Sequence, residues 1–289
     1  MLGGDGADTK TLADFWYFSV ASQEWVLAPT AKSKPGKRKH AGLSCGTGEC
    51  IVANGSNGIS LIKDTWVYTE RPGSWSQINC RKSVCPSARM MVAMAYDPGR
   101  FYHLLFGGLG AQGSLDDTYS FAGGVWEREA MPDADENAER PEARRSAAMA
   151  YASSPVNRIV MHGGQKENVG ALCDLWTWNG DMWQPVTASG AAAPCLHSHN
   201  IAWDGARLMV TGGYVDVSDT SNNSIWFFEF EDATSGNWVI GLDPTSCYSS
   251  VKPGARMAHD NATGSNVFFG GSENGPNGVI IYGETTICD

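Results

Sequence analysis

Arginines that recur at a fixed position are the residues of this sequence best suited to bind a ligand. Each one follows a proline in a Pro-x-x-Arg segment, and a histidine takes the place of the arginine in a fifth copy. A guanidinium pairs bidentately with a carboxylate, so a cluster of these groups would bind an acidic ligand. The candidate binding residues are Arg38, Arg89, Arg144, His197 and Arg256.

Two histidines are the residues that could begin a metal site. His197 and His199 alternate along a predicted strand and would therefore share one face of it. The alternative, which we favour, is that they replace the arginine and a strand residue of the repeat. The sequence has no Gly-x-Ser-x-Gly nucleophile motif and no phosphate-binding loop. We therefore expect no enzymatic activity, no metal and no cofactor.

These residues belong to a repeat of about 50 to 57 residues. One element is a hydrophobic segment that ends in Gly-Gly, as at Leu104–Gly108 and Ile159–Gly164. Asn54 replaces the first glycine in one copy, and asparagine is the next-best residue for a left-handed backbone. An Asp-x-aromatic segment follows, as at Asp64–Trp66, and then a lone tryptophan. The lone tryptophans are Trp25, Trp75, Trp126, Trp183 and Trp238.

Each repeat is predicted to form four short antiparallel strands, a to d. Strand a follows Pro-x-x-Arg, strand b ends at Gly-Gly, strand c carries Asp-x-Trp, and strand d carries the lone tryptophan. No convincing amphipathic helix interrupts them. Four antiparallel strands at this period are typical of a propeller blade. One tryptophan in each blade could then wedge against the neighbouring blade.

The recurring Gly-Gly, Asp-x-Trp and spaced tryptophan resemble the kelch repeat. Met-Ala-Tyr before strand b and Leu-Phe-Gly-Gly after it are similar to repeats of the galactose-oxidase-like group. The resemblance covers essentially the whole chain and implies an all-β, kelch-type β-propeller with strand a innermost.

The candidate binding residues would then ring one mouth of the central channel, where some kelch domains hold acidic peptides with arginines. A cluster of cations in a concave mouth would focus potential despite the negative net charge. The alternative, which the repetition favours, is structural: each arginine bonds carbonyls or a carboxylate of the adjacent blade.

We expect one domain over residues 1–289, with about six four-stranded blades. Five blades are the alternative if the two ends of the chain form one blade. The leader-less start, where Met1 runs into Leu2-Gly3-Gly4 at the end of a repeat, favours a fragment of a longer protein. The predicted blades span 1–29 (partial), 38–83, 89–132, 144–188, 197–245 and 256–289 (partial).

Eight cysteines and three glycosylation sequons favour an oxidising, secretory context. Buried free thiols in a cytosolic protein are the alternative. The sequons lie at Asn54, Asn222 and Asn261. Short spacings and loops that share a face of the propeller predict the disulfides Cys45–Cys50, Cys80–Cys85, Cys173–Cys195 and Cys247–Cys288.

The net charge and the hydropathy of the sequence argue against two classes of function, nucleic-acid binding and membrane insertion. A net charge of −10 argues against a general nucleic-acid binder. No stretch approaches the ~18 apolar residues of a membrane span, so we expect no membrane insertion. The loops at 133–145 and 214–223 are further candidate contacts, because long loops often carry function.

We therefore expect a secreted or extracellular binding module of a larger assembly, whose partner is a protein, an acidic peptide or a glycan. A fold does not fix a function, so two alternatives stay open. One is a metallo-oxidase or sugar-modifying enzyme on a propeller scaffold. The other is a structural subunit of an extracellular filament or coat.

Overall fold

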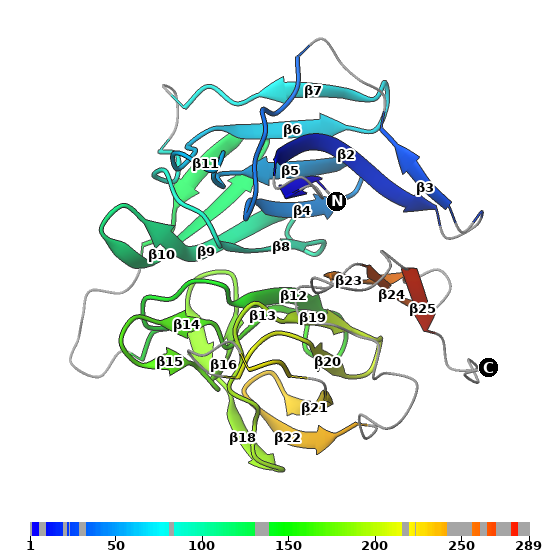
Figure 1. The fold of residues 1–289 in the computed structure, drawn as a ribbon. Coiled ribbons are helices and arrows are strands. Elements are labelled where there is room, and N and C mark those ends of the chain that lie inside the picture. Colours follow the sequence, from blue (N-terminus) through cyan, green and yellow to red (C-terminus); the bar gives the residue numbers. More distant parts are fainter. Residues whose placement is uncertain are drawn as a thin grey trace. The chain divides into compact units, whose positions relative to one another are not determined.

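The computed structural model describes β-strands joined by turns and loops, with no helix among the described residues (Figure 1). The chain divides into two compact units, Met1–Met131 and Pro132–Asp289. Nothing described has the helical length and hydrophobicity needed to cross a membrane. Only the backbone is described for Asp5 and beyond residue 255. The described residues are 2–5, 10–19, 22, 24–28, 33–80, 84–130, 139–215, 220–222, 224–241, 256–260, 265–269 and 279–282.

The first unit is built from antiparallel sheets of consecutive strands (Figure 1). Within its described residues these are a three-stranded sheet in the order β1-β2-β3 and two four-stranded sheets, β4-β5-β6-β7 and β8-β9-β10-β11. The strands are β1 (Leu2–Asp5), β2 (Thr11–Ser19), β3 (Glu24–Leu27), β4 (Gly42–Gly46), β5 (Glu49–Ala53), β6 (Thr65–Thr69), β7 (Ser74–Gln77), β8 (Ala93–Asp97), β9 (Tyr102–Gly110), β10 (Gly113–Ala122) and β11 (Val125–Arg128).

The second unit repeats the same order. Its sheets are β12-β13-β16-β17, β19-β20-β21-β22 with β18 added beside β22, the small hairpin β14-β15, and β23-β24-β25. The strands are β12 (Ala148–Ala152), β13 (Arg158–His162), β14 (Gln165–Lys166), β15 (Gly170–Ala171), β16 (Leu175–Trp178), β17 (Trp183–Pro185), β18 (Thr187–Gly190), β19 (Asn200–Trp203), β20 (Leu208–Thr211), β21 (Ile225–Asp232), β22 (Ser235–Ile240), β23 (Arg256–Asp260), β24 (Ser265–Phe269) and β25 (Val279–Tyr282).

The all-β class and the four-strand pattern of the complete repeats are confirmed. The partial repeats at the two ends each supply three paired strands, including the predicted strand at Val279–Tyr282. Strand β18 was not predicted. It pairs parallel with β22 as the chain leaves one sheet and runs along the outer edge of the next. The outer strand of a sheet has a row of unpaired backbone N–H and C=O groups. A neighbouring segment such as β18 can pair with these groups while the order of the four repeat strands stays the same.

The glycine pairs set the exit from strand b. Gly107 and Gly163 have φ angles of 61° and 62°, and Asn54 adopts 62° at the same position. This confirms the prediction that Asn54 takes the left-handed role of the first glycine, which asparagine tolerates. The second glycine is more constrained. A Cβ at Gly164, where φ is 102°, would lie 2.9 Å from the Ala147 Cβ and 3.0 Å from the Arg145 carbonyl oxygen.

Successive sheets pack against each other through their faces, so the hydrophobic core lies between sheets. In each unit the first strands of neighbouring sheets lie close together: β4 beside β8, and β19 beside both β12 and β23. The backbone also joins them, because the Met91 amide donates to the His40 carbonyl at 2.9 Å and the Ser198 amide to the Ser146 carbonyl at 2.9 Å. Each of these sheets therefore depends on its neighbour for burial.

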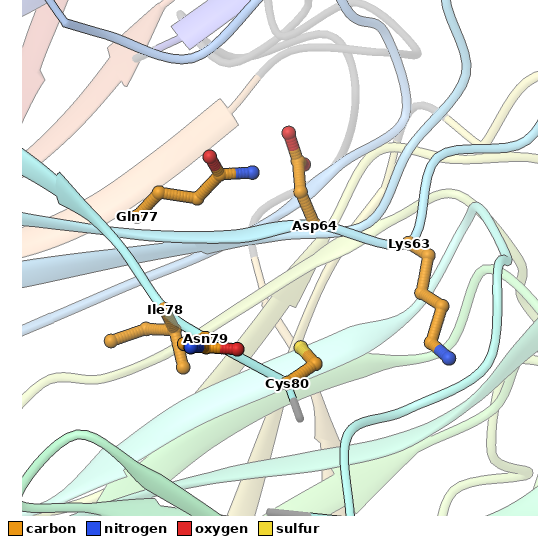
Figure 2. Close-up of a pocket in the computed structure, with 6 residues that line it drawn as sticks. All are labelled: Lys63, Asp64, Gln77, Ile78, Asn79 and Cys80. Carbon is orange, nitrogen blue, oxygen red and sulfur yellow. The ribbon is translucent and has the colours of Figure 1, made fainter. Parts of the chain in front are cut away.

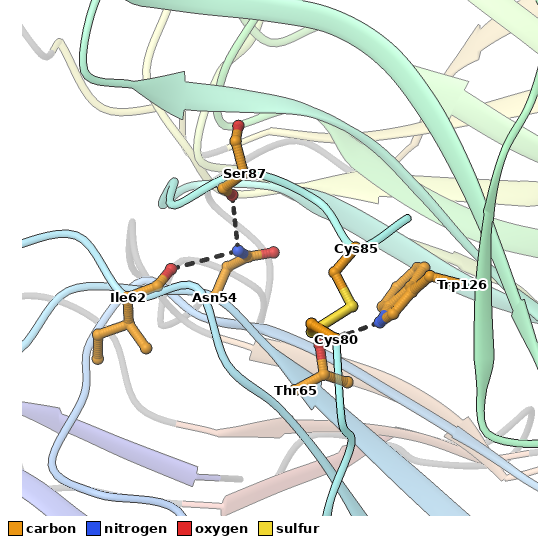
Figure 3. The surroundings of a disulfide bond; sticks show 7 residues. All are labelled: Asn54, Ile62, Thr65, Cys80, Cys85, Ser87 and Trp126. Carbon is orange, nitrogen blue, oxygen red and sulfur yellow. Dashed lines mark hydrogen bonds between the residues drawn. A yellow bond between two sulfur atoms is a disulfide. The ribbon is translucent and has the colours of Figure 1, made fainter. Parts of the chain in front are cut away.

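The lone tryptophans supply much of this contact, as predicted. The Trp126 indole, on β11, donates to Thr65 Oγ1 of the neighbouring sheet at 3.0 Å (Figure 3). Trp75, on β7, packs edge-on against Phe15 of β2 with ring centroids 5.1 Å apart. A tryptophan buries a large apolar area while its N–H finds a partner, which suits an interface between two sheets.

Three of the predicted disulfides are present. Cys45–Cys50 joins β4 to β5, and Cys80–Cys85 closes a short loop after β7 (Figure 3). Cys173–Cys195 links the approach to β16 with the segment before β19. The predicted pair Cys247–Cys288 lies outside the described residues. Three bonded pairs are typical of an oxidising, extracellular environment.

Replacing Trp126 with alanine should destabilise the first unit by about 3–5 kcal/mol, because the substitution empties an inter-sheet contact that is 1% exposed. Urea unfolding followed by circular dichroism would measure the loss. The matched control is Val125→Ala in the same strand, where the side chain is 45% exposed. A similar loss in both variants would contradict the wedge between sheets.

Candidate functional site

The recurring arginines are buried inside the sheets and bound to the aspartate of the Asp-x-Trp segment. The Arg38 Nη1 lies 2.7 Å from Asp64 Oδ1, and Arg144 Nη1 lies 2.6 Å from Asp174 Oδ1. Arg89 pairs with Asp117 in the same way. Each aspartate belongs to the same repeat as its arginine; Asp64 and Asp174 lie immediately before strand c, and Asp117 lies within β10.

The tryptophan of the Asp-x-Trp segment completes the arrangement. The Trp66 indole donates to Asp64 Oδ2 at 2.8 Å, and the Trp176 indole donates to Asp174 Oδ2 at 2.7 Å. Burial would raise the pKa of Asp174, but the hydrogen bonds from Arg144 and Trp176 outweigh it and hold the pKa below its usual value. The motif is therefore a charge-assisted hydrogen-bond unit.

The guanidiniums have few donors left for a ligand. Arg89 uses all five of its N–H groups: on the backbone oxygen and Oγ of Ser87, on the Gly107 carbonyl and on both oxygens of Asp117. Arg38, Arg89 and Arg144 are each at most 1% exposed. The geometry favours the structural alternative over a ligand-binding ring, with the carboxylate supplied by the same repeat and not by the adjacent one. Arg256 begins β23, and its side chain lies outside the described atoms.

His197 does not occupy the arginine position, which corrects the sequence alignment. The Gly55 amide donates to the Arg89 carbonyl, and the equivalent Gly164 amide donates to the carbonyl of Leu196. Leu196 therefore takes the place of the arginine and is fully buried. The error is a shift of one residue, because the proline of this copy lies one position closer to strand a than the others do.

The same repeat has also lost the aspartate. Ser224 stands where the other repeats have Asp, so both charged partners are replaced together. The Asn222 amide Nδ2 donates to the Gly212 carbonyl at 3.1 Å, which matches the carbonyl that Arg89 and Arg144 reach in their own repeats. It also donates to the Ser224 carbonyl at 3.1 Å. A neutral amide therefore replaces the buried ion pair.

The two histidines proposed to share a strand face lie apart. Ser198 between them has a φ angle of 55°, which breaks the alternation, and both residues precede β19. The His197 ring packs on Tyr214, whereas His199 Nε2 lies 2.9 Å from Nδ1 of His162 on β13. The described residues offer no group of three metal ligands. The structure gives these histidines packing and hydrogen-bonding roles.

A buried histidine that the sequence did not indicate joins two sheets of the first unit. His103 Nδ1 lies 2.9 Å from Ser44 Oγ, and its ring packs against Tyr96 with centroids 4.7 Å apart. Glu49 Oε1 lies 3.5 Å from His103 Nε2. Ser44 and His103 are 6% and 1% exposed, so this Ser-His-Glu arrangement cannot reach an external substrate. Burial lowers the pKa of His103 to about 4.

Two of the three predicted glycosylation sites are incompatible with the folded structure. Asn54 is 1% exposed, and its Nδ2 donates to the carbonyls of Ile62 and Ser87 (Figure 3). Asn222 is 7% exposed, and its Nδ2 donates to the carbonyls of Gly212 and Ser224. A glycan on either nitrogen would need the hydrogen that these bonds use and the space that the protein fills. Asn261 lies outside the described residues.

The two candidate contact loops are described only in part. In the first, 133–145, residues 139–145 are described, and Glu142 pairs with Lys166 at 2.6 Å. In the second, 214–223, residues 216–219 and 223 fall outside the description. The described part of the second loop is anchored by Asn222 and by the backbone bridge between Tyr214 and Ser221. Contact with a partner stays a prediction for both loops.

A polar pocket lies at one end of the sheet β4–β7, where the b–c and d–a loops meet (Figure 2). Its volume is about 520 Å³, within the range of small-molecule sites. The lining comes from the residues that lead into β6 and from those that end and follow β7. These are Lys63, Asp64, Gln77, Ile78, Asn79 and Cys80.

The pocket side chains differ in exposure. Asp64 is half-buried and bound to Arg38 and Trp66, whereas Lys63, Gln77 and Asn79 are exposed to solvent. Lys63 and Asp64 are adjacent in the sequence and point away from each other (Figure 2). The Cys80–Cys85 disulfide holds the start of the following loop. Sequence analysis missed this site; the one available signal is the polar cluster that flanks the Asp-x-Trp and cysteine motifs.

No protein-family model matches the sequence, and no curated protein matches it. The local geometry is therefore the basis for inferring a function. It places the repeated charged residues inside the sheets and leaves a separate polar pocket at the loop end of one sheet.

Asp117→Ser should destabilise the protein by about 3–5 kcal/mol, because it leaves the Arg89 guanidinium buried without its carboxylate. The double variant Arg89→Leu/Asp117→Ser reproduces the Leu196 and Ser224 positions, and it should lose less than the sum of the two single variants. Urea denaturation of all four proteins would measure this coupling. The neighbouring Asp116→Ser is the control, and strictly additive losses would contradict the ion-pair unit.

Stability should fall as the pH drops from about 6.5 to about 4. Burial lowers the pKa of both His103 and His162 to about 4, so the folded state favours the neutral rings while the unfolded chain takes up protons near its ordinary value of 6.5. Each ring contributes up to about 1.4 kcal/mol per pH unit in that window. Thermal melts across the window should lose about half of their pH dependence in His103→Gln, because His162 still contributes, and should keep it in the exposed His40→Asn.

Proposed function

We propose that this chain is a kelch-type β-propeller of six blades that acts as a secreted or extracellular binding module. The chain would supply four complete blades and two partial blades at its ends. The proposal extends the observed sheet order to a closed ring around a central axis. It leaves the partner as a protein, an acidic peptide or a glycan.

The repeat geometry supports the kelch part of this proposal. Each complete repeat runs through four consecutive antiparallel strands, and first strands of neighbouring sheets lie side by side within each unit. Sheets arranged radially bury their faces against both neighbours and leave only short outer edges, as in propellers. The arginine, aspartate and tryptophan of the motif also meet in one hydrogen-bond unit. This structural role explains why the three residue types recur together in the repeat.

The disulfides support the extracellular part. Three pairs of cysteines are bonded, and two of them close loops between residues five positions apart. Such bonds form and persist where the surroundings are oxidising. A chain kept reduced in the cytosol would not retain them.

The pocket beside Lys63 is the observation that carries the binding function. It is concave, its size suits a small ligand or one residue of a polymer, and its exposed side chains offer an ammonium and two amides. The carboxylate in its wall is already neutralised by Arg38. Groups of this kind recognise and hold a polar ligand, whereas the buried arginines and histidines, with the aspartates that pair with the arginines, stabilise the sheets.

Gln77→Trp should abolish ligand binding, because an indole at this position would fill the pocket. Screening the folded chain against immobilised glycans and acidic peptides should yield a bound class that is lost in this variant. The control is Glu70→Trp, at the opposite end of the same sheet, which should bind as the wild type does. Binding that survives Gln77→Trp would contradict the site. Stoichiometric copper or iron in the purified protein would favour an oxidase instead.

A further inference from the structure

The two units carry very different charge. Residues 1–131 contain 13 basic and 12 acidic residues, for a net charge of +1, whereas residues 132–289 contain 8 and 19, for a net charge of −11. The overall net charge of −10 therefore comes from the second unit, and the first unit is close to neutral.

Within the first two sheets of that unit, charge is also divided between the two ends of the strands. The b–c and d–a loops lie at one end, and the a–b and c–d turns lie at the other. The acidic side chains Glu24, Glu49 and Glu70 lie at the turn end with one basic side chain, Arg71, in or next to the turns. The loop end carries the lysines Lys10, Lys34, Lys37, Lys39 and Lys63.

The described acidic side chains at this loop end are held by other residues. Asp64 accepts hydrogen bonds from Arg38 and Trp66, and Asp14 accepts one from Trp16. Arg38 therefore compensates the charge of Asp64, and the lysines at this end outnumber the described acidic side chains. The next sheet differs, because it places Asp116, Asp117 and Glu129 at that end. The cationic surface is thus confined to the sheets β1–β3 and β4–β7.

The lysine-bearing loops are joined to each other and to the pocket. Lys39 forms a backbone bridge with Ser56 of the b–c loop, and Ser56 bridges in turn to Leu61, two residues before Lys63. Arg38, between Lys37 and Lys39, reaches directly to Asp64 in the pocket wall. The lysine-bearing loop before β4 and the pocket are therefore linked through Ser56 and Asp64. A cationic surface concentrates anions in spite of the net charge of the chain.

The pocket lining favours a glycan over a peptide as the anion. Protein partners gain most of their affinity from aromatic or aliphatic anchors in desolvated pockets. This pocket offers one aliphatic side chain, Ile78, and several hydrogen-bonding groups. The amides of Gln77 and Asn79 both donate and accept, which matches the hydroxyl groups of a sugar. The Lys63 ammonium matches a carboxylate or sulfate group.

We propose that the pocket beside Lys63 binds an anionic oligosaccharide, one with uronate or sulfate groups, and that the chain of sugars continues over Lys37 and Lys39. This inference rests on the proposed binding function and specifies its ligand. One acidic group of the sugar lies on Lys63, and the hydroxyl groups of the same ring meet the amides of Gln77 and Asn79.

Calorimetric titration of the intact chain with a heparin hexasaccharide tests the proposal. We expect binding that weakens as salt is added, because exposed charges are screened. Lys63→Met should weaken it about tenfold, the loss typical of one charge-assisted hydrogen bond. Arg71→Met removes the same charge at the opposite end of the sheet and should change the affinity less than about twofold. Gln77→Glu should also weaken binding, by repelling the anion.

Three outcomes would overturn the inference. They are an absence of hexasaccharide binding, an equal loss in Arg71→Met and Lys63→Met, and equal binding of neutral maltohexaose. Hexaglutamate serves as the peptide probe. If it binds through Lys63 while the hexasaccharide does not, the glycan inference fails and the binding module stands. Both lysine and glutamine variants alter exposed side chains, and matching thermal melts confirm that they fold.

Discussion

The pairing of a buried arginine with the aspartate of the Asp-x-Trp segment is the interaction on which the loop end of three described sheets depends. A buried charge without a partner would cost several kcal/mol, so the pair persists only because nearly every donor and acceptor is used. The arginine comes from the segment before strand a, its carbonyl partner ends strand b, and its aspartate begins strand c. One side chain therefore fixes three connections of the sheet, and one of them, the approach to β6, forms a wall of the pocket.

The repeat with Leu196 shows which part of this constraint is essential. It lacks both charges, yet its sheet has the same strand order as the others. Asn222 still bonds the carbonyl of Gly212, the position at which strand b turns away. The turn thus requires a donor for that carbonyl, and the charge pair is one way to provide it. Replacing both charged partners together avoids the cost of leaving one buried alone.

Sequence patterns predicted the parts of the structure that depend on local backbone geometry. Paired glycines, with Asn54 in one copy, mark positive φ angles that few residues accept, and lone tryptophans mark contacts between sheets. Predictions from these patterns were wrong where the outcome depends on residues that are distant in the sequence. The proline before Leu196 shifted the alignment by one residue, and the sequons at Asn54 and Asn222 gave no sign that their amides are buried. The pocket was missed because its residues share a surface and not a motif.

The division between buried and exposed charge connects the fold to the proposed binding function. Arginine, with its planar and weakly hydrated guanidinium, is used where a carboxylate must be held inside the protein. Lysine, a compact and strongly hydrated charge, remains at the surface in the loops that the arginines position. Because Arg38 neutralises Asp64 in the pocket wall, Lys63 can attract an anion without an opposing charge beside it. The structural ion pair therefore sets the electrostatic character of the pocket as well as its shape.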